Sequence, residues 1–267
     1  METAKPLTTA QPAAHQWSAV EFEQLALEAM DIDALNTDAR PKVAVFDCDG
    51  TLWSGDAGLG FMEWSIEQGI VSRSSADWID NRHRAYRAGK VSEEAICGEM
   101  VQIYSGLREE ELRSAAARYF ETTVKARIFP ELESLIAALE KRGVQLWAVS
   151  STNRWVVAEG VRHFGISPER ILAADVRVVK GLITAEILDV PTDEGKATAL
   201  RRVGLDRPDA VFGNSIHDLA MLEIARHAFP VNPSPALVDA AAQRGWGYFR
   251  PAGADVMQAG VSGEGKA

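Results

Sequence analysis

Residues 43–53 read VAVFDCDGTLW. The first four residues are apolar and mostly β-branched or aromatic, which predicts a short buried strand. Two carboxylates, Asp47 and Asp49, follow the strand, and Gly50 after them signals a loop. Because side chains alternate along an extended chain, both carboxylates can point the same way, where they repel each other unless they share a cation or a proton. The stretch therefore predicts a charged site; the simpler alternative is a strand followed by an ordinary acidic turn.

Length, charge and cysteine content exclude several classes of protein. The chain has 267 residues and a formal net charge of −10. Nucleic-acid binding needs clustered Lys and Arg, so this charge predicts no nucleic-acid partner. No apolar run is long enough to cross a membrane, and the first residues lack the pattern of a secretory signal, so we expect no membrane partner. Two cysteines, Cys48 and Cys97, are too few for a disulfide framework, so we expect a cytoplasmic protein.

Hydrophobic periodicity predicts alternating strands and helices with one long helical interruption. The interruption comprises helices at 59–67, 75–87, 92–104 and 109–120. Outside it we expect one strand that begins at 43 and further strands at 144–150, 171–176, 210–212 and 228–231. A hairpin is expected over 177–188, with its turn at Lys180-Gly181. The expected helices are at 20–30, 131–141, 152–164, 192–203, 218–226 and 235–244. Strands separated by helices of this length pair in parallel, so the fold class is α/β: a doubly wound parallel sheet with an inserted all-helical cap.

The pattern also predicts how the chain is divided. We expect a flexible tail at 1–17, an α/β core formed by 18–54 together with 129–252, a helical cap at 55–128 and a flexible tail at 253–267. Ser92, followed by two glutamates, is the predicted N-cap of one cap helix.

Polar residues follow three of the predicted strands, and ligands of doubly wound sheets bind at such strand ends. Lys196 lies in the first turn of the helix before the third of these strands. A carboxylate, a hydroxyl, an ammonium group and further oxygen ligands would meet at one edge of the sheet, which suits phosphoryl transfer. The stretches concerned are Asp47-Cys48-Asp49-Gly50-Thr51, Ser150-Ser151-Thr152-Asn153 and Gly213-Asn214-Ser215-Ile216-His217-Asp218.

This set of motifs resembles that of the haloacid dehalogenase (HAD) superfamily, specifically its phosphoserine-phosphatase-like branch with a helical cap of the C1 type. The resemblance covers about residues 40–250 and implies a phosphatase acting on a small-molecule phosphate ester. The oligomeric state, monomer or homodimer, stays open. The motifs, in the order of the family, are Asp47-x-Asp49-Gly50-Thr51-Leu52, Val149-Ser150-Ser151, Lys196 and Gly213-Asn214-Ser215-x-x-Asp218.

The resemblance implies a role for each catalytic residue. Asp47 would attack phosphorus and form an aspartyl-phosphate, and Asp49 would be the general acid and base. Ser150 would donate a hydrogen bond to a phosphoryl oxygen. Lys196 would offset the negative charge; Lys180, at the predicted hairpin turn, is the less well placed rival. Further phosphate or substrate contacts are assigned to Thr51, Gly50, Ser151 and Asp56.

The resemblance also implies a magnesium cofactor. The Asp47 carboxylate, the Asp49 backbone carbonyl and the last motif would hold Mg²⁺, with waters completing the octahedron. The family usually has Asp where this chain has Asn214, whose amide brings no charge. Asn214 would then bind the metal weakly, and Asp218 would ligate it directly, orient a bound water or act as a helix N-cap.

Three hypotheses for function follow. The first is a magnesium-dependent phosphatase. The second is a phosphate-ligand binding or regulatory protein with catalysis weakened by Asn214, and the third is a phosphotransferase that uses an acceptor other than water. In the cap, Asp56 is expected near the substrate's amino group, alone or with Trp53 as an aromatic box for an amine.

Overall fold

The fold is built on a six-stranded sheet in the order β5-β4-β3-β2-β6-β7. The computed structural model describes residues 13–31 and 41–254. All neighbouring strands are parallel except β4 and β5, which form an antiparallel hairpin. The strands are β2 (Val43–Phe46), β3 (Gln145–Asn153), β4 (Ile171–Val179), β5 (Leu182–Asp189), β6 (Ala210–Gly213) and β7 (His227–Pro230). The expectation of a mostly parallel α/β sheet is confirmed.

Helices cover both faces of this sheet, because β2 is apolar on both sides. Ala44 and Phe46 belong to one buried cluster, and Val43 and Val45 belong to the other. The first cluster includes residues of α1 (Ala19–Glu28), α6 (Pro130–Lys141) and α7 (Arg154–Arg162). The second includes residues of α8 (Glu194–Arg202), α9 (Leu219–Ile224) and α10 (Pro235–Arg244). A continuous apolar strand buried on two faces is typical of a doubly wound sheet.

The segment after β2 is helical, as the periodicity indicates. It contains α2 (Ala57–Glu67), α3 (Arg73–Arg87), α4 (Glu93–Gln102) and α5 (Glu109–Tyr119), followed by a π turn (Phe120–Val124) and a 3₁₀ turn (Lys125–Arg127). Ser92 caps α4 as predicted, because its hydroxyl accepts the Ala95 N–H. The entry and exit of the segment lie side by side: the N–H of Ser54 donates to the carbonyl of Arg127 at 2.9 Å.

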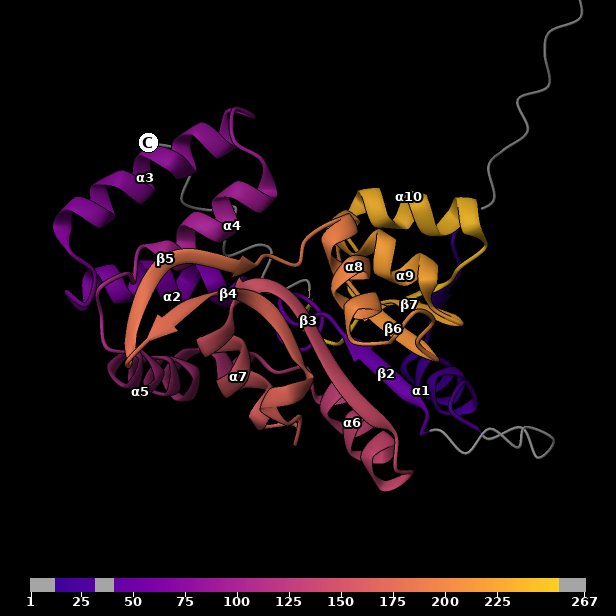
Figure 1. The fold of residues 1–267 in the computed structure, drawn as a ribbon. Helices are drawn as coiled ribbons and strands as arrows, with labels where there is room; N and C mark the ends of the chain where they lie inside the picture. Colours follow the sequence, from indigo (N-terminus) through magenta and orange to yellow (C-terminus); the bar gives the residue numbers. More distant parts are fainter. Residues whose placement is uncertain (1–12, 32–40, 255–267) are drawn as a thin grey trace, which may run out of the picture.

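Figure 1 shows α2 to α5 gathered at the end of the sheet formed by β4 and β5, with α8, α9 and α10 on the other side of the molecule. Helix α4 contacts β3, β4 and β5. The cap boundaries at 55 and 128 stay a prediction.

Several predicted boundaries are wrong. Strand β3 runs to Asn153 rather than 150, because a register shift against β4 lengthens it and the Asn153 side chain then caps α7. Strand β4 continues to Val179, since it pairs along the whole hairpin; the turn at Lys180-Gly181 is as predicted. The helix expected at 218–226 is divided into a 3₁₀ turn (Ile216–Asp218) and α9.

Two segments assigned to flexible tails are partly ordered. Gln16 and Trp17 form β1, which pairs in parallel with β8 (Tyr248–Phe249). Ala254 is buried. The rest of the predicted tails, 1–12 and 255–267, lies outside the described residues. No helix in the described part of the chain combines the length and apolarity that a membrane crossing needs. Cytoplasmic location stays a prediction.

Candidate active site

The three polar motifs meet at the carboxyl ends of neighbouring strands. Asp47 directly follows β2, Ser150 lies near the end of β3, and Asp218 follows β6. Since β2 is flanked by β3 and β6, these side chains reach the same edge of the sheet. Lys196 comes from the first turn of α8, as the sequence predicts.

A buried lysine joins two of the aspartates. The ammonium group of Lys196 donates to Asp47 Oδ1 at 2.7 Å and to Asp218 Oδ1 at 2.5 Å. All three side chains are nearly inaccessible to solvent, at 3%, 6% and 0% exposure. Two carboxylates and one ammonium group buried together leave an excess of negative charge, which is costly unless another cation or a proton is present.

Burial and this excess of negative charge change the pKa of Asp47. Burial and the charge of Asp218 raise the pKa of Asp47 to about 7, although Lys196 opposes the shift. Burial alone would lower the pKa of Lys196, but the charges of Asp218 and Asp47 raise it above its ordinary value. Lys196 therefore keeps its proton, and Asp47 is the group of this cluster that responds to a cation.

Asp218 also organises the loop after β6. Its Oδ2 accepts the N–H groups of Asn214 at 2.8 Å and Ser215 at 2.9 Å. Gly213 permits this approach, because a Cβ there would lie 2.7 Å from the Cβ of Asp218. With Oδ1 on Lys196, both oxygens of Asp218 are engaged, which favours a positioning role over direct metal ligation.

The loop after β2 is fixed around Asp47. The Thr51 hydroxyl donates to Asp47 Oδ2 at 3.0 Å. Gly50 has a φ of +76°, and a Cβ on it would come within 1.9 Å of Asn214 Nδ2. The Asn214 amide thus lies directly against Gly50. Asn232, which the sequence reasoning missed, also contacts this loop, since its Nδ2 donates to the Gly50 carbonyl at 3.3 Å.

Asp49 is held by three hydrogen bonds from three different elements. Its Oδ1 accepts from Trp53 Nε1 at 2.6 Å and from the N–H of Ala57 at 2.7 Å. Its Oδ2 accepts from the Thr152 hydroxyl at 2.6 Å. Trp53 is completely buried. The hypothesis that Trp53 and Asp56 form an aromatic box is therefore wrong, because the face of this indole is not available to a ligand.

Two serines near the end of β3 lie close to the same site. Ser150 is buried, and its hydroxyl oxygen accepts the Thr152 N–H at 3.1 Å, so its proton is free to point elsewhere. Ser151 is half-buried and lies beside Cys97. Burial and the charges of Asp47 and Asp49 raise the pKa of the Cys48 thiol, which fits its interpretation as a structural residue.

Asp56 is the N-cap of α2, with Oδ1 accepting the Leu59 N–H at 2.8 Å. Its side chain is exposed to solvent, and the surrounding protein atoms and the charge of Asp49 raise the pKa of Asp56 above its ordinary value. Glu93 at the start of α4 adds to this shift. Asp56 thus lies near Asp49, and Glu93 lies near Asp56.

The structure also shows contacts of Arg127, His217 and Arg154 that the sequence did not indicate. Arg127 is half-buried near Gly55, and no ion pair is found for it among the described residues. His217 contacts Asp193 at 2.7 Å. Arg154 donates to the backbone carbonyls of Ile171 and Pro168. These contacts join segments far apart in sequence, which no local pattern indicates.

The donor set for a metal is limited. Residues 13–31 and 41–254 contain no group of three or more His, Cys, Asp or Glu side chains arranged to hold one. The predicted set differs in kind, since besides the carboxylates of Asp47 and Asp218 it draws on the Asp49 backbone carbonyl and the Asn214 amide. These are oxygen donors, which Mg²⁺ prefers, and the excess negative charge around Lys196 would be offset by a cation. These residues fit magnesium.

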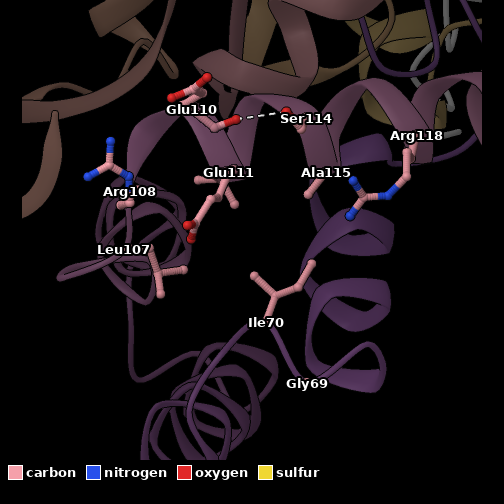
Figure 2. A pocket seen from close by; sticks show the side chains of 10 residues that line it. Gly69, Ile70, Leu107, Arg108, Glu110, Glu111, Ser114, Ala115 and Arg118 are labelled. Atoms are coloured by element: carbon pink, nitrogen blue, oxygen red, sulfur yellow. Dashed lines mark hydrogen bonds between the residues drawn. The ribbon is translucent and has the colours of Figure 1, made fainter.

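A cavity of about 670 Å³ lies elsewhere, between the end of α2 and α5. Figure 2 shows Leu107 and Glu111 close together on one side, Arg118 of α5 on the opposite side and Ile70 below them. None of the candidate catalytic residues lines this cavity.

Comparisons with known proteins agree with this arrangement. A histidinol-phosphatase of Neisseria meningitidis serogroup C (strain 8013) is 23% identical over 215 residues, covering 76% of this chain and 96% of that protein. A protein of unknown function from Bordetella pertussis Tohama I has a similar fold, with a TM-score of 0.70, 21% identity, and coverage of 79% of this chain and 99% of that one. A phospho-aspartyl intermediate analogue of phosphoserine phosphatase gives a TM-score of 0.53 at 17% identity, covering 82% and 99%.

The model of one family matches residues 44–223, from the strand before Asp47 to the helix after Asp218. This match spans well over half of the chain and contains all four motifs. The chain belongs to the haloacid dehalogenase-like hydrolase family.

Proposed function

We propose that this protein is a magnesium-dependent phosphatase that hydrolyses a small-molecule phosphomonoester through an aspartyl-phosphate on Asp47. The observation that supports this most is the buried contact of Asp47 with Lys196, which is shared with Asp218. A carboxylate at the end of a strand, held by one ammonium group and one hydroxyl, is oriented for attack on an electrophile. The family match and the relatives named as phosphatases agree with it.

The chemistry has two steps. In the first, a carboxylate oxygen of Asp47 forms a bond to phosphorus while the bond to the leaving oxygen breaks, and Asp49 gives that oxygen a proton. In the second, Asp49 takes a proton from a water, whose oxygen bonds to phosphorus and releases Asp47 and inorganic phosphate.

Lys196 offsets negative charge in both steps, and the Ser150 hydroxyl donates to a phosphoryl oxygen. The Thr51 hydroxyl, which donates to Asp47 Oδ2 in the free protein, turns to a phosphoryl oxygen once the phosphate is bound, and Gly50 and Ser151 complete the loops around it. Magnesium, held by Asp47, the Asp49 carbonyl and Asn214, would supply charge neutralisation at the phosphoryl oxygens.

Two carboxylates support a substrate class: Asp56, which lies near Asp49, and Glu93, which lies near Asp56. Asp56 and Glu93 favour an organic group that carries an ammonium charge. Relatives are named histidinol-phosphatase and phosphoserine phosphatase, and the substrates those names imply carry such a charge. Phosphoserine has a carboxylate that histidinol phosphate lacks. Arg127, near Gly55, is the candidate partner for this carboxylate. An Arg127→Gln variant should weaken binding of phosphoserine and leave KM for histidinol phosphate unchanged.

The test is phosphate release from p-nitrophenyl phosphate with and without Mg²⁺, followed by a panel that includes phosphoserine and histidinol phosphate. Metal-dependent release that is lost in Asp47→Asn supports the proposal. A folded protein that binds phosphate esters but turns over none of the panel supports the binding or regulatory alternative. Transfer to an added alcohol in preference to water supports the phosphotransferase alternative.

A further inference from the structure

We propose that Trp53 and Thr152 are positioning residues that give the two Asp49 oxygens different roles. Oδ1 only accepts hydrogen bonds, while Oδ2 exchanges the proton with the leaving group. This rests on the proposed function. Neither residue belongs to the four motifs that the sequence analysis used for catalysis. The proposal comes from the donors that surround the Asp49 carboxylate.

The first oxygen is saturated by groups that can only donate. Trp53 Nε1 and the N–H of Ala57 lie 2.6 and 2.7 Å from Oδ1. An indole N–H and a backbone N–H cannot reverse their direction. A proton on Oδ1 would face both of them, so the protonated form of Asp49 must carry its proton on Oδ2.

The second oxygen has a partner that serves both protonation states. The Thr152 hydroxyl lies 2.6 Å from Oδ2, and a hydroxyl can donate or accept. It accepts the proton of Oδ2 in the resting acid, and it donates to Oδ2 when that proton goes to a substrate oxygen. Proton transfer then breaks the O–H bond at Oδ2 and forms one on the leaving oxygen, which keeps the electron pair of the broken P–O bond.

The packing around these two residues fixes the geometry. Thr152 is 8% exposed and Trp53 is fully buried. A Cβ on Gly58 would lie 2.4 Å from Thr152 Oγ1, and a Cβ on Gly160 would lie 2.6 Å from the Trp53 ring. Two glycines thus let the helices α2 and α7 come close enough to hold the donors against Asp49.

A pair of aryl phosphates of similar shape tests the proposal. Phenyl phosphate releases a phenol with a pKa of about 10 and needs the proton of Asp49, whereas p-nitrophenyl phosphate releases a stabilised anion that does not. Thr152→Val keeps the size of the side chain and removes the hydroxyl. We expect it to lower kcat/KM for phenyl phosphate at least tenfold more than for p-nitrophenyl phosphate. Thr152→Ser, the matched control, should restore the wild-type ratio of the two substrates.

Trp53→Phe keeps an aromatic ring and removes the N–H donor, so it should shift the ratio in the same direction. Far-UV circular dichroism and urea unfolding check that each variant folds. Parallel losses on both substrates, or a Ser variant that behaves like the Val variant, would overturn the proposal. Wild-type protein that hydrolyses neither ester would contradict the proposed phosphatase function itself, which is a different outcome.

Discussion

Asp47→Asn should make the metal-free protein more stable at pH 8, although it removes the proposed nucleophile. Asp47 and Asp218 share one buried cation, Lys196. The amide oxygen introduced by the substitution would still accept from Lys196, and one carboxylate would remain for one ammonium group. Removing a surplus buried charge is stabilising, at the expense of function.

The size of the effect follows from the pKa of Asp47, which rises from 3.8 to about 7 on folding. Between these values the folded protein binds more protons than the unfolded chain, so the free energy of unfolding falls as pH rises. About three pH units at 1.36 kcal/mol each correspond to roughly 4 kcal/mol of destabilisation by the charge of Asp47. The substitution also weakens the hydrogen bond from Lys196, because its acceptor is no longer charged, and this costs about 1.5–3 kcal/mol. We expect a net gain of about 1–3 kcal/mol at pH 8 that shrinks toward zero near pH 4.

Asp209 is the matched control. It is also buried, but it has two cations of its own, Lys42 at 3.3 Å and Arg226 at 3.5 Å, and it accepts the N–H of Val43 at 3.0 Å. Because its charge is balanced, Asp209→Asn should destabilise the protein by about 1–3 kcal/mol.

The assay is urea unfolding followed by tryptophan fluorescence, in EDTA, at pH values from 4.5 to 8. Two results would contradict an excess of buried charge at Asp47. One is a loss of stability in Asp47→Asn at pH 8 as large as that in Asp209→Asn, and the other is a pH dependence of its stability equal to that of the wild type.

Three further predictions use the same site. Gly50→Ala should abolish turnover and cost more stability than Gly69→Ala, because both have positive φ but only a Cβ at residue 50 meets Asn214, at 1.9 Å; equal urea midpoints would contradict this. Lys196→Met should abolish turnover and destabilise the protein by about 3–5 kcal/mol, because it leaves buried carboxylates unpaired. Lys180→Ala, at the hairpin turn, should change neither turnover nor stability, and similar kinetics for the two variants would contradict the role of Lys196. Asn214→Asp should lower the Mg²⁺ concentration for half-maximal turnover by about tenfold, and an unchanged magnesium titration would argue against Asn214 as a ligand.

The sequence was sufficient for the parts of the site that lie next to a strand end. Four apolar residues before Asp47 indicate a buried strand, and the helical pattern around Lys196 places it in a first turn. Because parallel strands end at one edge, the meeting of Asp47, Lys196 and Asp218 could be predicted without knowing the fold in detail.

The parts that could not be predicted depend on tertiary contacts. Thr152 reaches Asp49 across 103 positions, from a part of β3 where the register against β4 shifts. Trp53 is fully buried with its N–H on Asp49, whereas the sequence allowed it to face a ligand. Asp218 uses both oxygens within the protein, which a motif alone does not indicate.

Trapping of the covalent intermediate shows whether Asp47 is the nucleophile. The protein would be mixed with Mg²⁺ and p-nitrophenyl phosphate, quenched in acid, reduced with borohydride and digested, and the peptide that contains Asp47 analysed by mass spectrometry. If Asp47 is the nucleophile, this peptide carries homoserine in place of the aspartate, and the modification is missing without substrate. Turnover with an unmodified Asp47, or at the wild-type rate in Asp47→Asn, would contradict it.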